Sequence, residues 1–309
     1  MGNCQTLNKV TVVIADDCGS GSGGRQALDV KVTESFIPSS IENDNFQIPI
    51  KTFTPTPNTT SSSTTTTTTP RAVVFFIHGG IFALGDMHSH PTISNALSSQ
   101  LGLVVITASF RNGEEAPHAS NVTMTDLNDV VNYCIRTYPD LPFGLVGSSS
   151  GGFFAIHLSQ TLQQQPSKKK EVAFCIPICP VADPFKRASY LRSSISGSAQ
   201  SEGYNAVHTP EKSKFILEKQ LSFWQNDESM LEASASTKSN TRNVPTLLII
   251  GSADKNVPFV VTNEVQGWAT RTIVIGGRGH ELCDEVVGGY CCYLPDVERF
   301  LEYCLREEK

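Results

Sequence analysis

A serine flanked by glycines is the feature of this chain that most directly indicates chemistry. Gly147, Ser149 and Gly151 form a G-x-S-x-G pentapeptide, with an apolar run before it and a helix-compatible run after it. A serine on such a strand-to-helix turn is exposed as a nucleophile, and the free N–H groups of the following helix point at any oxyanion formed there. The pattern predicts acyl transfer through Ser149. In a chain with 23 glycines, this pentapeptide alone is a weak signal for a nucleophile. The interpretation therefore depends on finding the other residues that the chemistry needs.

Acyl transfer by serine also requires a general base. Among the seven histidines, His280 follows the apolar run 272–275 on a glycine-rich loop, as expected of a residue just beyond a strand. His157 falls inside the helix expected after the serine. The other candidates lie in loops with no strand end to place them: His88, His90, His118 and His208. We therefore predict His280 as the base.

The base needs a carboxylate that fixes its tautomer. Asp254 follows the apolar run 246–250 after a short turn, and the resulting chain order is serine, acid, histidine. Asp183 and Asp284 are rival carboxylates. The first begins an expected insertion, and the second lies too few residues beyond His280 to reach back easily. We predict Asp254 as the orienting carboxylate.

Backbone N–H groups are the expected donors to the oxyanion. Gly79 and Gly80 follow an apolar run that ends at His78, and glycine backbone can approach a substrate closely. Together with the N–H of Ser150, they form the predicted donor set, with His78 bracing the loop. Three apolar residues beside these donors would line an acyl or alcohol pocket, although core packing explains them equally well: Ile81, Phe82 and Phe153.

Apolar runs that alternate with helical patterns would position these residues. The expected strands are 10–14, 30–32, 47–53, 72–78, 103–109, 143–146, 172–178, 246–250 and 272–275, and the expected helices are 91–101, 124–138, 150–164, 259–270 and 295–306. Continuously apolar runs indicate strands that are buried on both faces. The alternation predicts an α/β fold with a mostly parallel, twisted sheet covered by helices on both faces. Parallel strands place their carboxyl ends at one edge, where the candidate residues would meet.

The chain is expected to form one domain with an insertion. Residues 1–53 would supply an N-terminal segment and the first strands, as an antiparallel start to the sheet. The Thr/Ser-rich stretch 54–70 is too polar and repetitive to pack, so we expect a disordered loop. Residues 71–309 would form the catalytic core, with a helical cap inserted at about 184–241, where the strand-helix rhythm is interrupted.

Composition excludes several classes of protein. A length of 309 residues, 39% hydrophobic residues and a net charge of −6 are typical of a globular protein without a nucleic-acid surface. No apolar run approaches the length of a membrane span, and the N-terminus lacks the apolar core of a secretory signal, so we expect a cytoplasmic protein. The nine cysteines are odd in number and form no C-x-x-C pattern, which favours free thiols and no metal site.

The N-terminus carries a pattern for lipid attachment. The residues Met-Gly-Asn-Cys-Gln-Thr fit myristoylation of Gly2, and Cys4 is placed for palmitoylation. Two acyl chains would give peripheral membrane attachment, whereas one would not anchor stably. A short permissive pattern also arises by chance.

Five segments together resemble a known family. HGGIF (78–82), SFRNGEEAP (109–117), GSSSGG (147–152), GSADKNVPF (251–259) and GRGHE (277–281) are similar to motifs of the α/β-hydrolase superfamily, most of all to its hormone-sensitive-lipase-like carboxylesterases. Ile81 stands where that group has a third glycine, and Ser148 and Ser150 stand where it has Asp and Ala. None of these changes removes a backbone N–H.

The resemblance implies a cofactor-free esterase. Ser149 would be its nucleophile, His280 its base, Asp254 the partner of that base, and Gly79 and Gly80 part of the oxyanion hole. The expected partner is a small-molecule ester or a lipid. Hydrolysis of an amide or a thioester uses the same residues and stays open as an alternative, and a non-catalytic ligand-binding protein on the same fold is a further one.

Overall fold

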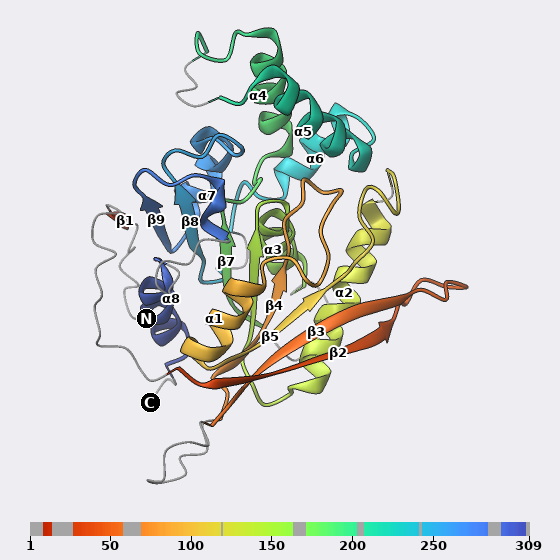
Figure 1. Ribbon diagram of the computed structural model, residues 1–309, viewed down its shortest axis with the longest axis vertical. Coiled ribbons are helices and arrows are strands. Elements are labelled where there is room, and N and C mark those ends of the chain that lie inside the picture. Colours follow the sequence, from red (N-terminus) through yellow and green to blue (C-terminus); the bar gives the residue numbers. More distant parts are fainter. Residues whose placement is uncertain are drawn as a thin grey trace.

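The computed structural model describes residues 9–13, 27–57, 69–118, 120–162, 171–202, 207–240, 243–283 and 292–306. Its centre is a sheet of nine strands in the order β1-β9-β8-β7-β6-β4-β5-β3-β2 (Figure 1). The strands are β1 (Lys9–Val13), β2 (Asp29–Pro38), β3 (Gln47–Thr56), β4 (Ala72–Ile77), β5 (Leu103–Ala108), β6 (Phe143–Ser148), β7 (Val172–Ile178), β8 (Leu247–Gly251) and β9 (Arg271–Ile275).

Most neighbouring strands are parallel, as predicted. Every residue of β4, β5, β6 and β8 is buried, which explains why their sequences are apolar without alternation. The exceptions are β2 and β3, which form an antiparallel hairpin against β5 at one edge. The prediction of an antiparallel start is wrong for the first run: β1 pairs in parallel with β9 at the opposite edge.

Helices cover both faces of the sheet and create two cores. One core contains side chains of α1 (Pro91–Leu101) and α8 (Leu294–Cys304). The other contains side chains of α2 (Ser120–Thr137), α3 (Ser150–Thr161) and α7 (Asn263–Trp268). The prediction of a mostly parallel sheet between two helical layers is therefore confirmed. Since residues on successive strand positions point to opposite faces, each buried strand contributes to both cores.

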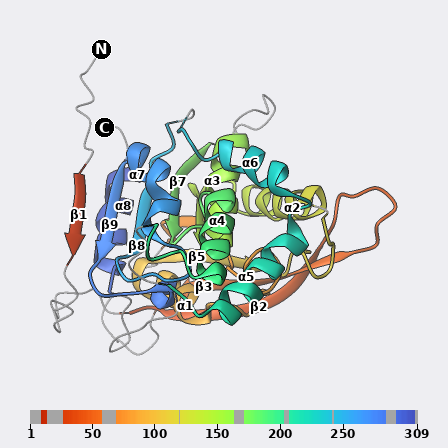
Figure 2. The ribbon, with the colours of Figure 1, turned by 90° about the horizontal axis from the view of Figure 1, so that it is seen from above.

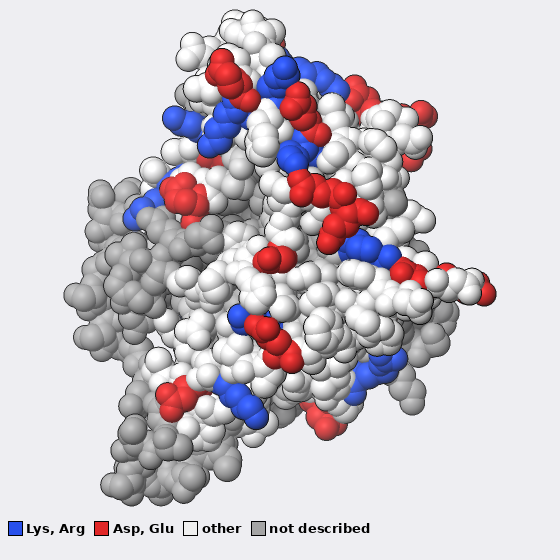
Figure 3. All heavy atoms as spheres, turned by 45° about the vertical axis from the view of Figure 1, so that its right-hand side comes forward, with Lys and Arg blue, Asp and Glu red and all other residues white. Residues whose placement is uncertain are grey.

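Three helices lie between β7 and β8, in the region where a cap was expected. They are α4 (Pro184–Ser196), α5 (Pro210–Phe223) and α6 (Asp227–Ala235), and they sit above the sheet in Figures 1 and 2. Side chains of Asp183, Thr209 and Asn226 cap their first turns. On the face shown in Figure 3, acidic and basic side chains are interspersed over these helices.

Two of the boundaries that differ from the sequence prediction have a local cause. The strand β3 continues to Thr56, into the stretch 54–70 expected to be disordered, because it pairs with β2 over its whole length. Residues 58–68 lie outside the described residues. The helix expected at 259–270 begins as a short 3-10 helix, η3 (Phe259–Thr262), behind Pro258 and becomes α7 only at Asn263.

A buried ion pair fastens the β2–β3 hairpin to the core. The Arg111 guanidinium donates from Nε and Nη2 to both carboxylate oxygens of Asp126 at 2.9 and 2.7 Å, and it also binds Asp44 in the hairpin turn. The side chain of Asp126 is fully buried on α2. Because a buried charge without its partner is strongly unfavourable, both members of this pair are needed together.

We expect Arg111→Met to lower the free energy of unfolding by about 3 to 5 kcal/mol, because the variant leaves the Asp126 carboxylate buried and unpaired. Urea unfolding followed by tryptophan fluorescence measures this loss. The control is Arg192→Met, which removes an exposed pair with Asp227 and should cost less than about 1 kcal/mol. Equal losses in the two variants would contradict the interpretation.

Candidate active site

Ser149 sits on a strained turn between β6 and α3. Its backbone has φ 55° and ψ −119°, a conformation that residues with a side chain rarely adopt. The Ser149 N–H donates to Ile178 O, and its carbonyl accepts from Val181 N–H, so both neighbouring segments hold the turn. A Cβ on Gly151 would lie 2.1 Å from Ile77 O, which explains why only glycine fits there. The turn presents the serine hydroxyl at the carboxyl edge of the sheet.

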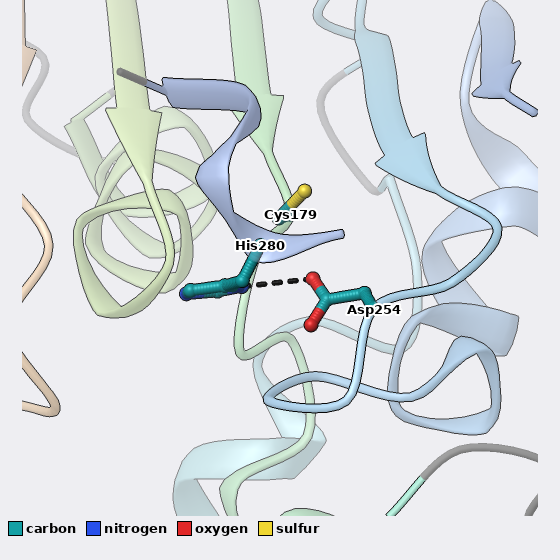
Figure 4. A group of neighbouring side chains, drawn as sticks. All are labelled: Cys179, Asp254 and His280. Carbon is teal, nitrogen blue, oxygen red and sulfur yellow. Dashed lines mark hydrogen bonds and ion pairs between the residues drawn. The ribbon is translucent and has the colours of Figure 1, made fainter. Parts of the chain in front are cut away.

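The predicted base and carboxylate reach this serine. His280 Nε2 lies 2.9 Å from Ser149 Oγ, and His280 Nδ1 lies 2.8 Å from Asp254 Oδ2. Figure 4 shows the imidazole and the carboxylate facing each other, with Asp254 on the loop after β8. If Nδ1 carries the proton, it donates to Asp254, and Nε2 is then free to accept the Ser149 proton. The structure brings the three residues together in one hydrogen-bonded chain.

Asp254 is held as an anion in a buried position. Burial alone would raise its pKa, but the hydrogen bond from His280 and those from the N–H groups of Val257 and Asn256 outweigh it, so the pKa lies below the usual value. Both backbone bonds measure 2.8 Å. The rival Asp183 instead caps α4 and accepts from Ser234 Oγ, and Asp284 lies outside the described residues.

The predicted oxyanion donors differ in whether their N–H groups already make a hydrogen bond. Gly80 has φ 139°, and a Cβ there would lie 1.9 Å from Leu84 O, so the loop requires glycine. Within the described part of the chain, the N–H groups of Gly80 and Ser150 have no hydrogen-bond acceptor. The Gly79 N–H, in contrast, donates to His90 Nε2 at 3.3 Å. Gly80 and Ser150 therefore offer their donors directly.

These residues surround a cavity of about 450 Å³. Its lining residues are Gly79, Gly80, Ile81, Leu84, Gly85, Ser89, His90, Ser148, Ser149, Asn256 and His280. Ile81 is thus at the cavity, as expected. Phe82 and Phe153 are not among the lining residues: each is 2% exposed, and both pack into a cluster of aromatic rings with Phe223 of the cap. Their large rings fill the core beside the cavity.

Two of the cavity residues that sequence reasoning missed form hydrogen bonds to predicted site residues. His90 was set aside because it follows no strand, yet its Nε2 accepts from Gly79 N–H and lies 3.2 Å from Ser148 Oγ. Asn256 lies two residues beyond Asp254 and donates its N–H to that carboxylate. Asn256 could have been predicted as a site residue from its proximity to Asp254 in the sequence. His90 could not, because no sequence pattern indicates the loop that brings it back to the serine.

Cys179 is the third side chain near the histidine and the carboxylate. Ligand atoms of Cys179, Asp254 and His280 lie within 4.8 Å of one another, and Figure 4 shows Cys179 on the loop after β7. Such donors are of the type that bind zinc. The carboxylate and imidazole, however, already hydrogen bond to each other, and the imidazole also bonds Ser149. Both groups are therefore engaged in hydrogen bonds of the Ser149–His280–Asp254 chain.

Other predictions concern the chain ends and the membrane. The predicted acylation sites, Gly2 and Cys4, lie outside the described residues. Among the helices that the structure describes, none combines the length and apolar character needed to cross a bilayer.

His78 contacts the loop that contains Gly79 and Gly80. Its Nδ1 lies 2.8 Å from Gly79 O, and its ring stacks on Phe110 with centroids 4.4 Å apart. The ring is 2% exposed, and its Nε2 has no hydrogen-bond partner in the described structure. Burial lowers the pKa of His78 to about 4. The residue is therefore neutral at physiological pH, with Nδ1 donating to the loop carbonyl.

Comparisons with known proteins find one matching family model and several similar proteins. A family model described as alpha/beta hydrolase fold matches residues 74–256. The carboxylesterase/phospholipase LipF of Mycobacterium tuberculosis is 30% identical over 111 residues, which are 36% of this chain and 29% of that protein. An acetyl-hydrolase of Streptomyces hygroscopicus is 29% identical over 106 residues, 33% of this chain and 34% of that protein. The chain thus spans about a third of the length of these relatives.

Solved structures are similar over nearly the whole chain. An esterase of Pyrobaculum calidifontis superposes with a TM-score of 0.64 at 17% identity, covering 89% of this chain and 84% of that one. Carboxyl esterase 2 of Tuber melanosporum gives a TM-score of 0.65 at 14% identity, covering 92% and 90%. At these identities the likeness concerns the fold.

We expect the neutral state of His78 to make folding stability depend on pH. His78 takes up a proton near pH 6.5 in the unfolded chain, but only near pH 4 in the folded protein, so between these values protonation favours the unfolded chain. The contribution of neutral His78 to the free energy of unfolding is therefore complete above pH 6.5. It is lost as the pH falls toward 4, by up to about 3 kcal/mol. Chemical unfolding between pH 7 and 4 should show a flatter decline for His78→Gln. The exposed control His88→Gln should follow the parent, and a His78→Gln variant with the parent slope would contradict this assignment.

Proposed function

The chain belongs to the α/β-hydrolase fold family, and on that premise we propose that it hydrolyses carboxylic esters through an acyl-enzyme intermediate. The observation that carries the proposal is the hydrogen-bonded chain from Asp254 through His280 to Ser149 Oγ. The relatives named as a carboxylesterase and an acetyl-hydrolase support the choice of an ester.

In the first half of the reaction, Ser149 is the nucleophile. His280 Nε2 accepts the Oγ proton while Oγ attacks the ester carbonyl carbon, and Asp254 stabilises the imidazolium that forms. The carbonyl oxygen becomes an oxyanion. Donors that stand in place before the reaction stabilise it most, because they need no reorganisation. The N–H groups of Gly80 and Ser150 are such donors, and Gly79 can join them only by leaving His90.

Collapse of this intermediate breaks the bond to the alcohol. His280 now donates its Nε2 proton to the leaving oxygen, and the acyl group stays on Ser149 Oγ. In the second half, His280 removes a proton from water as the water oxygen attacks the acyl carbon. The bond between that carbon and Ser149 Oγ then breaks, and the proton returns from His280 to restore the Ser149 hydroxyl. The products are a carboxylic acid and an alcohol. Every proton is carried by one imidazole nitrogen.

The cavity favours a small substrate. About 450 Å³ is at the lower end of the range for small-molecule sites. Ile81 and Leu84 are its apolar lining residues, while Ser89, His90 and Ser148 are polar. Short-chain esters therefore fit better than long acyl chains. An amide or thioester with a short acyl group would meet the same donors.

We expect Ser149→Ala to lower kcat for p-nitrophenyl acetate and butyrate by at least about a thousandfold, because the acyl acceptor is lost. A fluorophosphonate probe should label the parent at Ser149 and leave the variant unlabelled. The control Ser196→Ala changes an exposed serine of α4 and should keep the parent rate and labelling. Parental activity in the Ser149 variant would refute the nucleophile.

The same protein can be tested for hydrolysis of amides and thioesters, the two alternatives to an ester. Acetate esters, acetanilides and acetyl thioesters with matched acyl groups separate the three classes by kcat/KM. We expect esters to exceed amides, because an amide carbonyl is less electrophilic than an ester carbonyl and an amine is a poorer leaving group than an alcohol. A higher kcat/KM for the amide or the thioester than for the ester would contradict ester hydrolysis as the main activity and favour that other class of substrate.

Membrane attachment through Gly2 and Cys4 is a separate proposal that rests on the N-terminal pattern. We expect the native protein to carry a myristoyl group on Gly2 and a palmitoyl group on Cys4. Intact-mass analysis checks this directly, and a free or merely acetylated terminus would refute it.

A further inference from the structure

A buried arginine of the cap holds the loop that carries Asp254. Arg187 of α4 is fully buried. Burial lowers its pKa to about 10, so it is still a cation at neutral pH. Its Nε donates to Asn256 O at 3.0 Å, and its Nη1 donates to Gln220 Oε1 at 3.1 Å. In the described structure it makes no ion pair, and its charge is directed at this loop.

Arg187 also fixes the side-chain amide of Asn256. Its Nη2 contacts Asn256 Oδ1 at 2.5 Å. A guanidinium has only donors, so the amide oxygen must face it and the Nδ2 group must face the other way. The Asn256 N–H is bound to Asp254 Oδ1 at 2.8 Å. Three hydrogen bonds thus hold one residue, and its orientation is set before any substrate arrives.

The Nδ2 group of Asn256 is a donor without an acceptor. Asn256 is half-buried and lines the cavity. Within the described part of the chain, Nδ2 makes no hydrogen bond. A half-buried donor that is held rigidly at a cavity is suited to bind an oxygen atom of a ligand. The positive charge of Arg187 behind the amide strengthens its attraction for an acceptor.

The position of Asn256 selects the alcohol side of an ester. The Asn256 N–H and His280 Nδ1 bind the two oxygens of the Asp254 carboxylate, and both residues line the cavity, so Asn256 lies on the side of the site where His280 would deliver the proton to the leaving oxygen. The oxyanion donors Gly80 and Ser150 belong to other loops, after β4 and β6. We propose that Asn256 Nδ2 binds an acceptor oxygen in the alcohol part of the substrate. The preferred substrates are then short-chain esters of oxygen-bearing alcohols, such as alkoxy alcohols and polyols. This inference rests on the proposed ester hydrolysis.

Two matched pairs of esters test the inference. 2-Methoxyethyl acetate and butyl acetate differ only by oxygen in place of a methylene in the alcohol, and methyl methoxyacetate and methyl butyrate differ likewise in the acyl group. The ratio of kcat/KM within each pair is compared between the parent, Asn256→Leu and Asn256→Asp. Differences in intrinsic ester reactivity cancel in this comparison. Asn121→Leu, on an exposed site of α2, is the control.

We expect the ratio for the alcohol pair to fall about fivefold in Asn256→Leu, which is the loss of one hydrogen bond. It should fall further in Asn256→Asp, where one carboxylate oxygen pairs with Arg187 and the other repels the ether oxygen. The acyl-pair ratio should stay unchanged. Asn256→Asp keeps the shape of the loop, so it gives a result even if the leucine variant does not fold.

An unchanged alcohol-pair ratio in the Asp variant would overturn the inference, and so would a change confined to the acyl pair. The proposed function fails in a different way: the parent would cleave none of the four esters, and the fluorophosphonate probe would not label Ser149. The rate of fluorophosphonate labelling in each Asn256 variant measures the activation of Ser149 separately from the change in specificity.

Discussion

The hydrogen bond between Ser149 and His280 joins residues that are 131 positions apart in the chain. The candidate active site depends on this contact. What closes this distance is the parallel sheet. β6, β8 and β9 end at one edge, so the loops behind them carry Ser149, Asp254 and His280 to a common place. The central strands are buried on both faces, which keeps their ends fixed relative to one another. The chemistry therefore depends on strand register.

Backbone strain is concentrated at this edge. Ser149, Ile81, His90 and Cys179 all have positive φ without being glycine. Such conformations cost on the order of 1 to 3 kcal/mol each and persist only where the surroundings over-determine them. Here the surroundings are the two cores and the aromatic cluster around Phe82, which holds the loop after β4 against the cap. The rigid interior thus maintains a site whose local geometry is unfavourable.

The sequence was most informative where a residue follows a buried strand. The positions of Ser149, Asp254 and His280 were predictable because an apolar run and a short turn precede each of them. His90 could not be found in this way, since its place depends on how a loop folds back over Gly79. Phe82 and Phe153 were ambiguous because an apolar residue beside a site serves core or pocket equally well. The pairing of β1 with β9 was missed because periodicity identifies a strand but not its neighbour.

The hydrogen bonds between Arg187 and Asn256 restrict the motion of the cap relative to the loop that bears Asp254. The helix α4 and the loop that bears Asp254 are joined through hydrogen bonds from a fully buried guanidinium, whose donors would lose their acceptors if the two segments moved apart. A swinging motion of the cap would pull on the loop that carries Asp254 and strain the hydrogen bond from Asp254 to His280. These hydrogen bonds therefore favour a cap that keeps one position relative to the loop.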